Sequence, residues 1–229
     1  MRFLHDRATR MFADRRDGGR RLAELLRERP WSDPVVLGLA RGGVPVADEV
    51  AALLGAPLDV AVARKIGAPG RPEFGLGAVT ADGPPTYDER ILAALGLTAE
   101  DLAETCAAER AEARRRIARY QGEREPRRGR DVIVVDDGLA TGATARAALR
   151  AVRADRPRRL VFAAPVCAPD AVAALQRVAD DVVCVAAPEA FRAVGQWYDD
   201  FGQTTDEEDF GQTTDEEVVA VLDAARDRR

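Results

Sequence analysis

The residues best suited to bind a ligand or perform chemistry lie in one run of the sequence. In this run, two adjacent acids follow an apolar stretch and precede a turn with two threonines. Residues 132–144 read VIVVDDGLATGAT. Four apolar, mostly β-branched residues predict a buried strand, and residues 145–152 open a helix. Asp136 and Asp137 are therefore expected at the carboxyl end of a strand, the edge at which open α/β sheets bind ligands.

The two halves of this run favour two different chemical groups. The turn and the helix start offer unpaired backbone N–H groups and the positive end of a helix dipole, which both attract a phosphate. The carboxylates of Asp136 and Asp137 suit sugar hydroxyls or a metal ion. A ligand that satisfies both halves is a phosphorylated ribose.

Residues 132–144 resemble the signature that binds 5-phosphoribosyl 1-pyrophosphate (PRPP) in type I phosphoribosyltransferases, because the apolar pair, the acid pair and Thr-Gly-x-Thr keep that signature's offsets. The resemblance implies that Asp136 and Asp137 hold the ribose 2′- and 3′-hydroxyls. It also implies a 5′-phosphate loop made of Ala140, Thr141, Gly142, Ala143 and Thr144. The alternative is a generic strand-turn-helix with acids at the turn. The wider chain is similar to an uncharacterised bacterial branch of this family.

A second loop, Arg41-Gly42-Gly43, follows a short predicted strand. Glycines let a backbone approach a diphosphate closely, and Arg41 adds a forked cation. The family places its pyrophosphate loop here, so the resemblance assigns these residues to pyrophosphate. A tight strand-helix turn without a ligand is the alternative that this short motif leaves open.

A third group lies at Arg64-Lys65, and Lys65 is the one lysine among 34 basic residues. The pair resembles the start of the mobile catalytic loop in adenine- and orotate-type members. That resemblance implies that residues 66–81 close over PRPP, exclude water and bring positive charge to the departing pyrophosphate. Glu73 is then a candidate acid or base on the incoming nucleophile, with a plain solvated glutamate as the alternative.

The expected chemistry is a magnesium-dependent transfer. PRPP and two aspartates crowd negative charge, and Mg²⁺ held mostly by the oxygens of PRPP, with Asp136 and Asp137 contributing indirectly, would offset it. A nitrogen nucleophile, a nucleobase or related amine, then attacks C1 of the ribose and pyrophosphate leaves. Hypoxanthine-guanine members carry an aspartate where this chain has Ala140, which argues against a 6-oxopurine acceptor.

The sequence is therefore consistent with two functions. The first is an enzyme of nucleotide metabolism or salvage, a phosphoribosyltransferase. The alternative is a non-catalytic PRPP or nucleotide sensor with the same fold, which would regulate a partner. A dinucleotide-binding oxidoreductase domain fails on the spacing of its glycines and on the acid pair.

The elements that must position these residues predict an α/β fold. Strands are expected at residues 35–37, 58–63, 132–135, 159–164 and 181–186, and helices at 44–54, 145–152 and 169–178. Their order predicts right-handed crossovers and a doubly wound, mainly parallel five-stranded sheet. The resemblance adds a small hood built from the chain termini.

We expect three segments along the chain. Residues 1–30 form an N-terminal helical segment for the hood or for packing, as two short helices broken at Gly18-Gly19. Residues 31–190 form the core, with a mobile, irregular loop at 66–85 and a helical insertion at 87–120. Residues 191–229 form a tail in which Trp197 and Tyr198 either cover a nucleobase or pack in a core. The arginines of residues 127–130 are expected in a solvated turn.

The tail contains a tandem repeat, since residues 200–208 and 209–217 both read DFGQTTDEE. Each copy ends in Thr-x-x-Glu, which is typical of a helix start. An apolar helix follows the second copy directly, so we expect this copy to cap the last helix and the first to be additional loop. Deleting residues 209–217 should then cause little loss of stability.

Composition excludes several classes of function. The 229 residues carry a net charge of −5 and a pI near 5.2, which disfavours nucleic acid as a partner. The N-terminus lacks an apolar signal core, no run is long enough to span a membrane, and the three cysteines form no metal or disulfide pattern. We expect a cytoplasmic protein whose partners are PRPP and a small-molecule acceptor, with a homodimer as the candidate assembly.

Overall fold

Five parallel strands form the central sheet of the computed structural model, which describes residues 10–120, 124–201 and 213–228. Their order across the sheet is β2-β1-β6-β7-β8, and every neighbouring pair is parallel. The strands are β1 (Pro34–Leu39), β2 (Leu58–Ala61), β6 (Asp131–Val135), β7 (Arg159–Val166) and β8 (Asp181–Ala186). The predicted five-stranded parallel sheet is confirmed.

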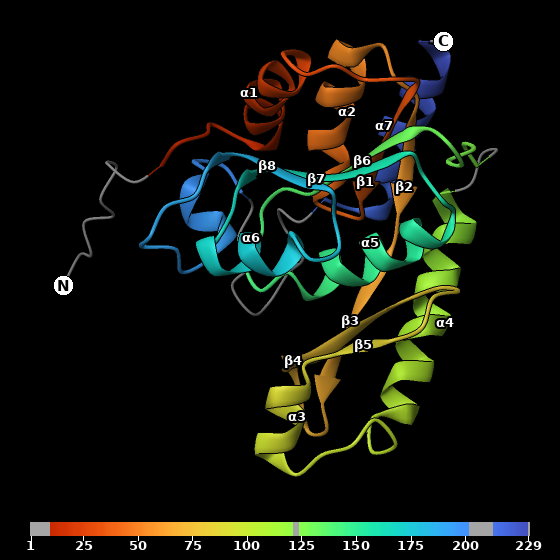
Figure 1. The fold of residues 1–229 in the computed structure, drawn as a ribbon, viewed down its shortest axis with the longest axis vertical. Coiled ribbons are helices and arrows are strands. Elements are labelled where there is room, and N and C mark those ends of the chain that lie inside the picture. The colour runs from red at the N-terminus through yellow and green to blue at the C-terminus, as the bar shows by residue number, and fades with distance from the viewer. Residues whose placement is uncertain (1–9, 121–123, 202–212, 229) are drawn as a thin grey trace.

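Helices cover both faces of this sheet (Figure 1). One face packs against α1 (Arg15–Arg27), α2 (Gly43–Leu54) and α7 (Asp215–Asp227), and the other against α5 (Ala143–Ala154) and α6 (Pro169–Leu175). Strand side chains alternate between faces, so Val36 packs with the first group and Val35 with the second. Burial on both sides explains why these strands are apolar throughout. Within the described ranges, no helix has the length and hydropathy needed to cross a bilayer.

The N-terminal helix continues through the two glycines that were expected to break it. A Cβ atom on Gly18 would lie 2.9 Å from Pro165 Cγ, and one on Gly19 would lie 2.9 Å from the carbonyl oxygen of Val46. The glycines therefore allow α1 to pack closely on β7 and α2. Asp14 caps the helix by accepting a 2.7 Å hydrogen bond from Asp17 N. The predicted pair of short helices was wrong.

Residues 66–85 also differ from expectation, because most of them belong to a three-stranded antiparallel sheet. It contains β3 (Ala63–Ala68), β4 (Arg71–Thr80) and β5 (Thr86–Tyr87). A Cβ atom on Gly67 would lie 2.3 Å from the Pro72 carbonyl oxygen, and one on Gly77 would lie 2.3 Å from that of Thr86. These glycines thus permit close backbone contacts within a sheet. The prediction of an irregular loop was wrong.

Helices α3 (Glu89–Leu95) and α4 (Ala103–Tyr120) pack against this small sheet, and the helices expected between residues 87 and 120 are present. The turn before α4 contains a Thr98–Asp101 pair, in which Thr98 N donates a 2.7 Å hydrogen bond to Asp101 Oδ2. Figure 1 shows α4 running from the small sheet back to the central domain. The small sheet is thereby tied to the main one at both ends.

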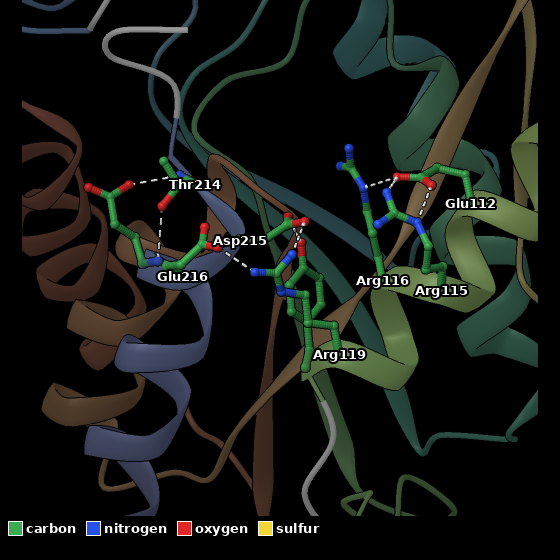
Figure 2. Close-up of polar contacts among 9 residues, drawn as sticks. Glu112, Arg115, Arg116, Arg119, Thr214, Asp215 and Glu216 are labelled. Carbon is green, nitrogen blue, oxygen red and sulfur yellow. Dashed lines mark hydrogen bonds and ion pairs between the residues drawn. The ribbon is translucent and has the colours of Figure 1, made fainter.

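The last helix begins as predicted, at the second copy of the repeat. Glu217 N donates to Thr214 Oγ1 over 3.1 Å, and Thr214 N donates to Glu217 Oε2 over 2.7 Å, which is a complete capping box. Figure 2 shows Arg119 of α4 reaching Asp215 and Glu216 at this helix start. Residues 202–212 lie outside the described part of the chain, and with them the loop expected for the first copy.

Arg127 was expected in a solvated turn and is buried instead. Its side chain is 5% exposed and forms ion pairs of 3.2 Å with Asp59 and 3.2 Å with Asp155. Asp59 lies in β2 and Asp155 ends α5. This arginine therefore ties the segment that precedes β6 to two elements of the core. Arg128, the next arginine along the chain, is exposed as predicted.

Candidate active site

The acid pair lies at the carboxyl end of β6, the middle strand of the central sheet. The neighbouring strand β1 ends at Leu39, and the turn with Gly42 and Gly43 follows it. Because β1 and β6 are parallel, the two strands end at the same edge. The topology therefore brings the candidate pyrophosphate loop beside the candidate ribose-binding acids.

Contact between the two loops is close enough to require glycine at both positions. A Cβ atom on Gly42 would lie 2.1 Å from Asp137 Oδ2. One on Gly43 would lie 2.4 Å from the carbonyl oxygen of Val135 and 2.8 Å from Asp136 Cα. Any side chain here would overlap the acid pair or its backbone. The Ala40–Arg41 peptide bond that leads into this turn is cis.

The start of α5 supplies hydrogen-bond donors beside the same edge. Gly142 is the N-cap residue and adopts a left-handed conformation with φ of 73°, and no side chain caps the helix. The first turn of a helix leaves backbone N–H groups without partners inside the helix, and an anion satisfies them well. Ala140 and Thr141 are exposed, so the loop of residues 140–144 is open to a ligand.

Each carboxylate of the pair uses one oxygen within the protein. Asp136 Oδ1 accepts a 2.9 Å hydrogen bond from Asp137 N, and Asp137 Oδ2 accepts a 2.8 Å hydrogen bond from Arg15 Nε. Among the contacts of the described residues, none uses Asp136 Oδ2 or Asp137 Oδ1. Two neighbouring carboxylate oxygens thus remain for hydroxyl donors or a cation.

The electrostatics of the pair favour the same ligands. Burial, and then the adjacent Asp137 carboxylate, raises the pKa of Asp136 well above its usual range. Burial also raises the pKa of Asp137, although the Arg15 guanidinium acts in the opposite direction. A cation or a pair of hydroxyl donors would stabilise both charges. Within the described ranges, no group of three or more His, Cys, Asp or Glu side chains could hold a metal ion by itself.

Two residues contact the acid pair that the sequence did not single out for this position. Arg15 opens α1 and lies 122 positions from Asp137 in the sequence. Tyr198 donates a 2.5 Å hydrogen bond from its hydroxyl to the backbone carbonyl of Asp137. No local pattern could have identified Arg15, because it is one of many arginines in helices.

The tail aromatics pack in a core. Tyr198 is 1% exposed and Trp197 is buried, and both belong to a cluster with Phe12. The rings of Phe12 and Tyr198 lie 5.3 Å apart between centroids. Of the two roles considered for these residues, the structure supports packing. Tyr198 still reaches the site through its hydroxyl.

The basic pair lies on β3, which begins just after β2 reaches the same sheet edge. The end of β2 is adjacent to the glycine turn, because Ala40 N donates a 2.8 Å hydrogen bond to the Ala61 carbonyl. Arg64 Nε donates to Glu109 Oε2 of α4 over 2.8 Å. Lys65 is exposed on the strand beside Gly75. Glu73 lies in β4, and its side chain is outside the described part of the structure.

Sequence and structure comparisons relate this chain to known proteins. The family model of the phosphoribosyl transferase domain matches residues 12–200. Two curated Mycobacterium tuberculosis proteins, "Putative phosphoribosyl transferase MT0597" and "Putative phosphoribosyl transferase Rv0571c", are each 44% identical over 218 residues. The match covers 94% of this chain and 47% of each relative, so the chain spans about half their length.

A solved structure is similar over nearly its whole length. TT1426 from Thermus thermophilus is 46% identical and superposes with a TM-score of 0.75. The superposition covers 93% of this chain and 97% of that one. The α/β architecture described above is thus shared with a close relative of similar size.

Proposed function

The chain belongs to the phosphoribosyl transferase domain family, and on that basis we propose that it transfers a 5-phosphoribosyl group from PRPP to a nitrogenous acceptor. Membership of the family implies PRPP binding. The observation that carries the proposal is the contact of Gly42 and Gly43 with Asp136 and Asp137. It puts a loop suited to a diphosphate directly beside the two carboxylates, each of which also has an oxygen that no contact of the described residues uses.

The proposed roles follow from the geometry of the sheet edge. The free oxygens of Asp136 and Asp137 accept hydrogen bonds from the ribose 2′- and 3′-hydroxyls. The N–H groups of residues 140–144 bind the 5′-phosphate at the positive end of α5. The turn at Gly42 binds the pyrophosphate, with Arg41 adding positive charge. All three subsites lie along one ligand that has a phosphate at each end.

The proposed reaction breaks the bond between C1 and the pyrophosphate oxygen and forms a bond between C1 and the acceptor nitrogen. Pyrophosphate leaves with the electron pair, and the nitrogen loses its proton to solvent or to a nearby base. Mg²⁺, bound mainly through the oxygens of PRPP, would neutralise charge on the leaving group. Arg64 and Lys65 would add positive charge beside the leaving pyrophosphate. For this, Arg64 would have to release Glu109 and bind the ligand instead. Glu73 is a candidate for the base that takes the proton of the acceptor nitrogen.

Only one residue of the signature bears on the acceptor, by arguing against one class. Ala140 occupies the position at which hypoxanthine-guanine members have an aspartate, so we propose an acceptor other than a 6-oxopurine. An adenine-type base or a related amine fits this position. The Mycobacterium relatives are named for the transfer alone, without an acceptor.

The test is pyrophosphate release from PRPP and Mg²⁺ in the presence of a panel of nucleobases and amines. We expect saturable release with at least one acceptor and loss of activity when Mg²⁺ is chelated. Changing both acids, Asp136→Asn with Asp137→Asn, should weaken PRPP binding, and unchanged affinity would contradict the ribose assignment. Saturable PRPP binding without turnover on any acceptor would reject the enzyme and leave a PRPP sensor.

A further inference from the structure

We propose that Arg15 is a positioning residue for PRPP, which aims the free oxygen of Asp137 at the ribose and is itself held by the first copy of the repeat. The inference rests on the proposed function, since it assumes that Asp137 binds ribose. It concerns a residue far from the signature in sequence. Three observations support it. Arg15 makes several contacts that fix its side chain, one oxygen of Asp137 is engaged while the other is left for a ligand, and the group that holds Arg15 belongs to the first copy of the repeat.

The contacts of Arg15 hold its guanidinium at three points. Nε donates to Asp137 Oδ2 over 2.8 Å, and Nη1 donates to the carbonyl of Phe201 over 3.1 Å. The guanidinium carbon lies 3.9 Å from the centroid of the Phe201 ring, as in a cation–π contact. The side chains of Arg15 and Asp137 are each 15% exposed. Because two of its nitrogens donate hydrogen bonds and its plane lies on an aromatic ring, the guanidinium of Arg15 has little freedom to rotate.

This arrangement decides which oxygen of Asp137 faces a ligand. Oδ2 is engaged by Arg15 and faces the glycine turn, where a Cβ atom on Gly42 would lie 2.1 Å away. Oδ1 is therefore the oxygen left for a ribose hydroxyl. Tyr198 fixes the backbone of the same residue by binding its carbonyl. Without Arg15 the carboxylate could rotate about its terminal torsion, which has a broad energy minimum.

The two copies of the repeat contribute to different places. Phe201 belongs to the first copy and holds Arg15 at the acid pair. Thr214 and Glu217 belong to the second copy and cap α7. Identical sequences therefore serve the site in one case and a helix start in the other. The equivalent of Phe201 in the second copy is Phe210, which provides a control of identical local sequence.

The experiment compares Arg15→Gln with Arg16→Gln. Arg16 is the next residue of α1 and pairs with Asp48 and Glu49, away from the acid pair. Titration calorimetry with Mg²⁺ measures binding of PRPP, ribose 5-phosphate and pyrophosphate. Arg15→Gln should weaken the two ribose ligands by about tenfold or more and weaken pyrophosphate clearly less, because Arg15 lies beside the Gly42 turn but donates to Asp137. Arg16→Gln should leave all three unchanged.

The ribose selectivity separates positioning from a structural role. Equal loss for pyrophosphate and PRPP would indicate general loosening of the site and would overturn the inference, as would unchanged PRPP affinity in Arg15→Gln. Arg15→Lys should fall between wild type and Arg15→Gln, because lysine keeps a charge near Asp137 but cannot make both hydrogen bonds. No rescue at all by lysine together with a lowered melting temperature would also count against positioning.

The repeat supplies the second comparison, Phe201→Ala against Phe210→Ala. Removing the Phe201 ring takes away the face on which the guanidinium rests, so the ribose ligands should bind several-fold more weakly. Phe210→Ala should bind them as wild type does. Equal effects of the two substitutions would overturn the assignment of the first copy to the site.

Failure of the proposed function would look different. If the wild-type chain binds none of the three ligands, the PRPP assignment fails. The positioning claim is then decided by crystal structures of wild type and Arg15→Gln. An Asp137 carboxylate in the same orientation in both would overturn it, and a rotated carboxylate would show that Arg15 orients Asp137, with only the identity of the ligand rejected.

Discussion

At the scale of single residues, Gly42 and Gly43 decide whether the two loops of the site can meet. The atoms that a new side chain would meet differ between the two positions. At Gly42 the nearest atom is the side-chain oxygen Asp137 Oδ2, and at Gly43 it is the backbone carbonyl oxygen of Val135. A side chain can rotate away from a new methyl group, whereas a strand backbone cannot without disturbing the sheet.

Gly42→Ala should therefore damage binding more than stability. The methyl group would displace the Asp137 carboxylate, and we expect PRPP affinity to fall by about tenfold or more while the melting temperature changes by a few degrees at most. Calorimetry and thermal denaturation measure the two effects. Gly43→Ala should instead destabilise the fold, by about 1–3 kcal/mol. The reverse pattern would show that the two close contacts are wrongly assigned.

Asp136 should make the unliganded protein less stable at neutral pH. Its pKa is higher in the folded state than in the unfolded chain, mainly through burial. The folded state thus binds more protons between those two pKa values, and stability is lost as the pH rises through that window. Asp136→Asn removes this effect and keeps an oxygen for the Asp137 N–H. We expect a gain of about 1 kcal/mol, or about 2–4 °C, at pH 8.

The pH dependence of that gain is its control. Near pH 5 the wild-type carboxyl takes up a proton more readily, so the advantage of Asp136→Asn should shrink in thermal melts. Asp137→Asn should stabilise the protein less than Asp136→Asn does, because it also removes the ion pair with Arg15, which offsets part of the cost of burying Asp137. A gain that is the same at every pH would contradict the electrostatic cause.

At the scale of elements, the last helix depends on a cap that only one copy of the repeat provides. Thr214 and Glu217 exchange hydrogen bonds at the start of α7. Thr214→Ala should cost about 1 kcal/mol, which is about 2–4 °C in melting temperature for a chain of this size. Thr205→Ala changes the same position in the first copy and should leave the melting temperature unchanged.

Removal of residues 209–217 tests the repeat as a whole. The shortened chain keeps one nine-residue segment directly before the apolar helix, so the capping box forms again and stability should change little. A fall of many degrees in melting temperature would contradict this. PRPP affinity measured on the same deletion shows whether one segment can hold Arg15 and cap α7 together.

The antiparallel sheet shows where prediction of elements from sequence fails. Glycine and proline between residues 66 and 85 are typical of loops, yet Gly67 and Gly77 are present because neighbouring carbonyls approach them closely. The same applies to Gly18 and Gly19 in α1. A glycine that breaks an element and a glycine that permits contact look identical in one sequence, because the difference lies in the partner.

At the scale of the whole molecule, Arg127 links the segment before β6 to β2 and α5. Arg127→Ala would leave Asp59 and Asp155 without their buried partner. We expect a loss of about 3 kcal/mol, at the low end for a broken buried pair because the Asp155 side chain is 41% exposed. Urea denaturation measures it.

The matched control is Arg128→Ala, one position along the same segment. Arg128 is exposed, so this change should alter the free energy of unfolding by less than about 0.5 kcal/mol. Similar losses for the two substitutions would show that the effect comes from overall charge, not from the ion pairs of Arg127.

The sequence by itself determined the five parallel strands, the acid pair at the end of β6 and the capping of α7. These depend on periodicity and on residues a few positions apart, which a single chain displays directly. It also indicated a phosphoribose ligand through the resemblance of residues 132–144 to a known signature.

Only the tertiary structure decided which distant residues meet at the acid pair. Arg15, near the start of the chain, reaches Asp137, and Phe201, far along the chain, holds Arg15 there. Their contact depends on strand order and on the close packing of α1 through its two glycines. Such contacts leave no mark in local sequence, because any of many arginines could form an ion pair and packing selects the one that does.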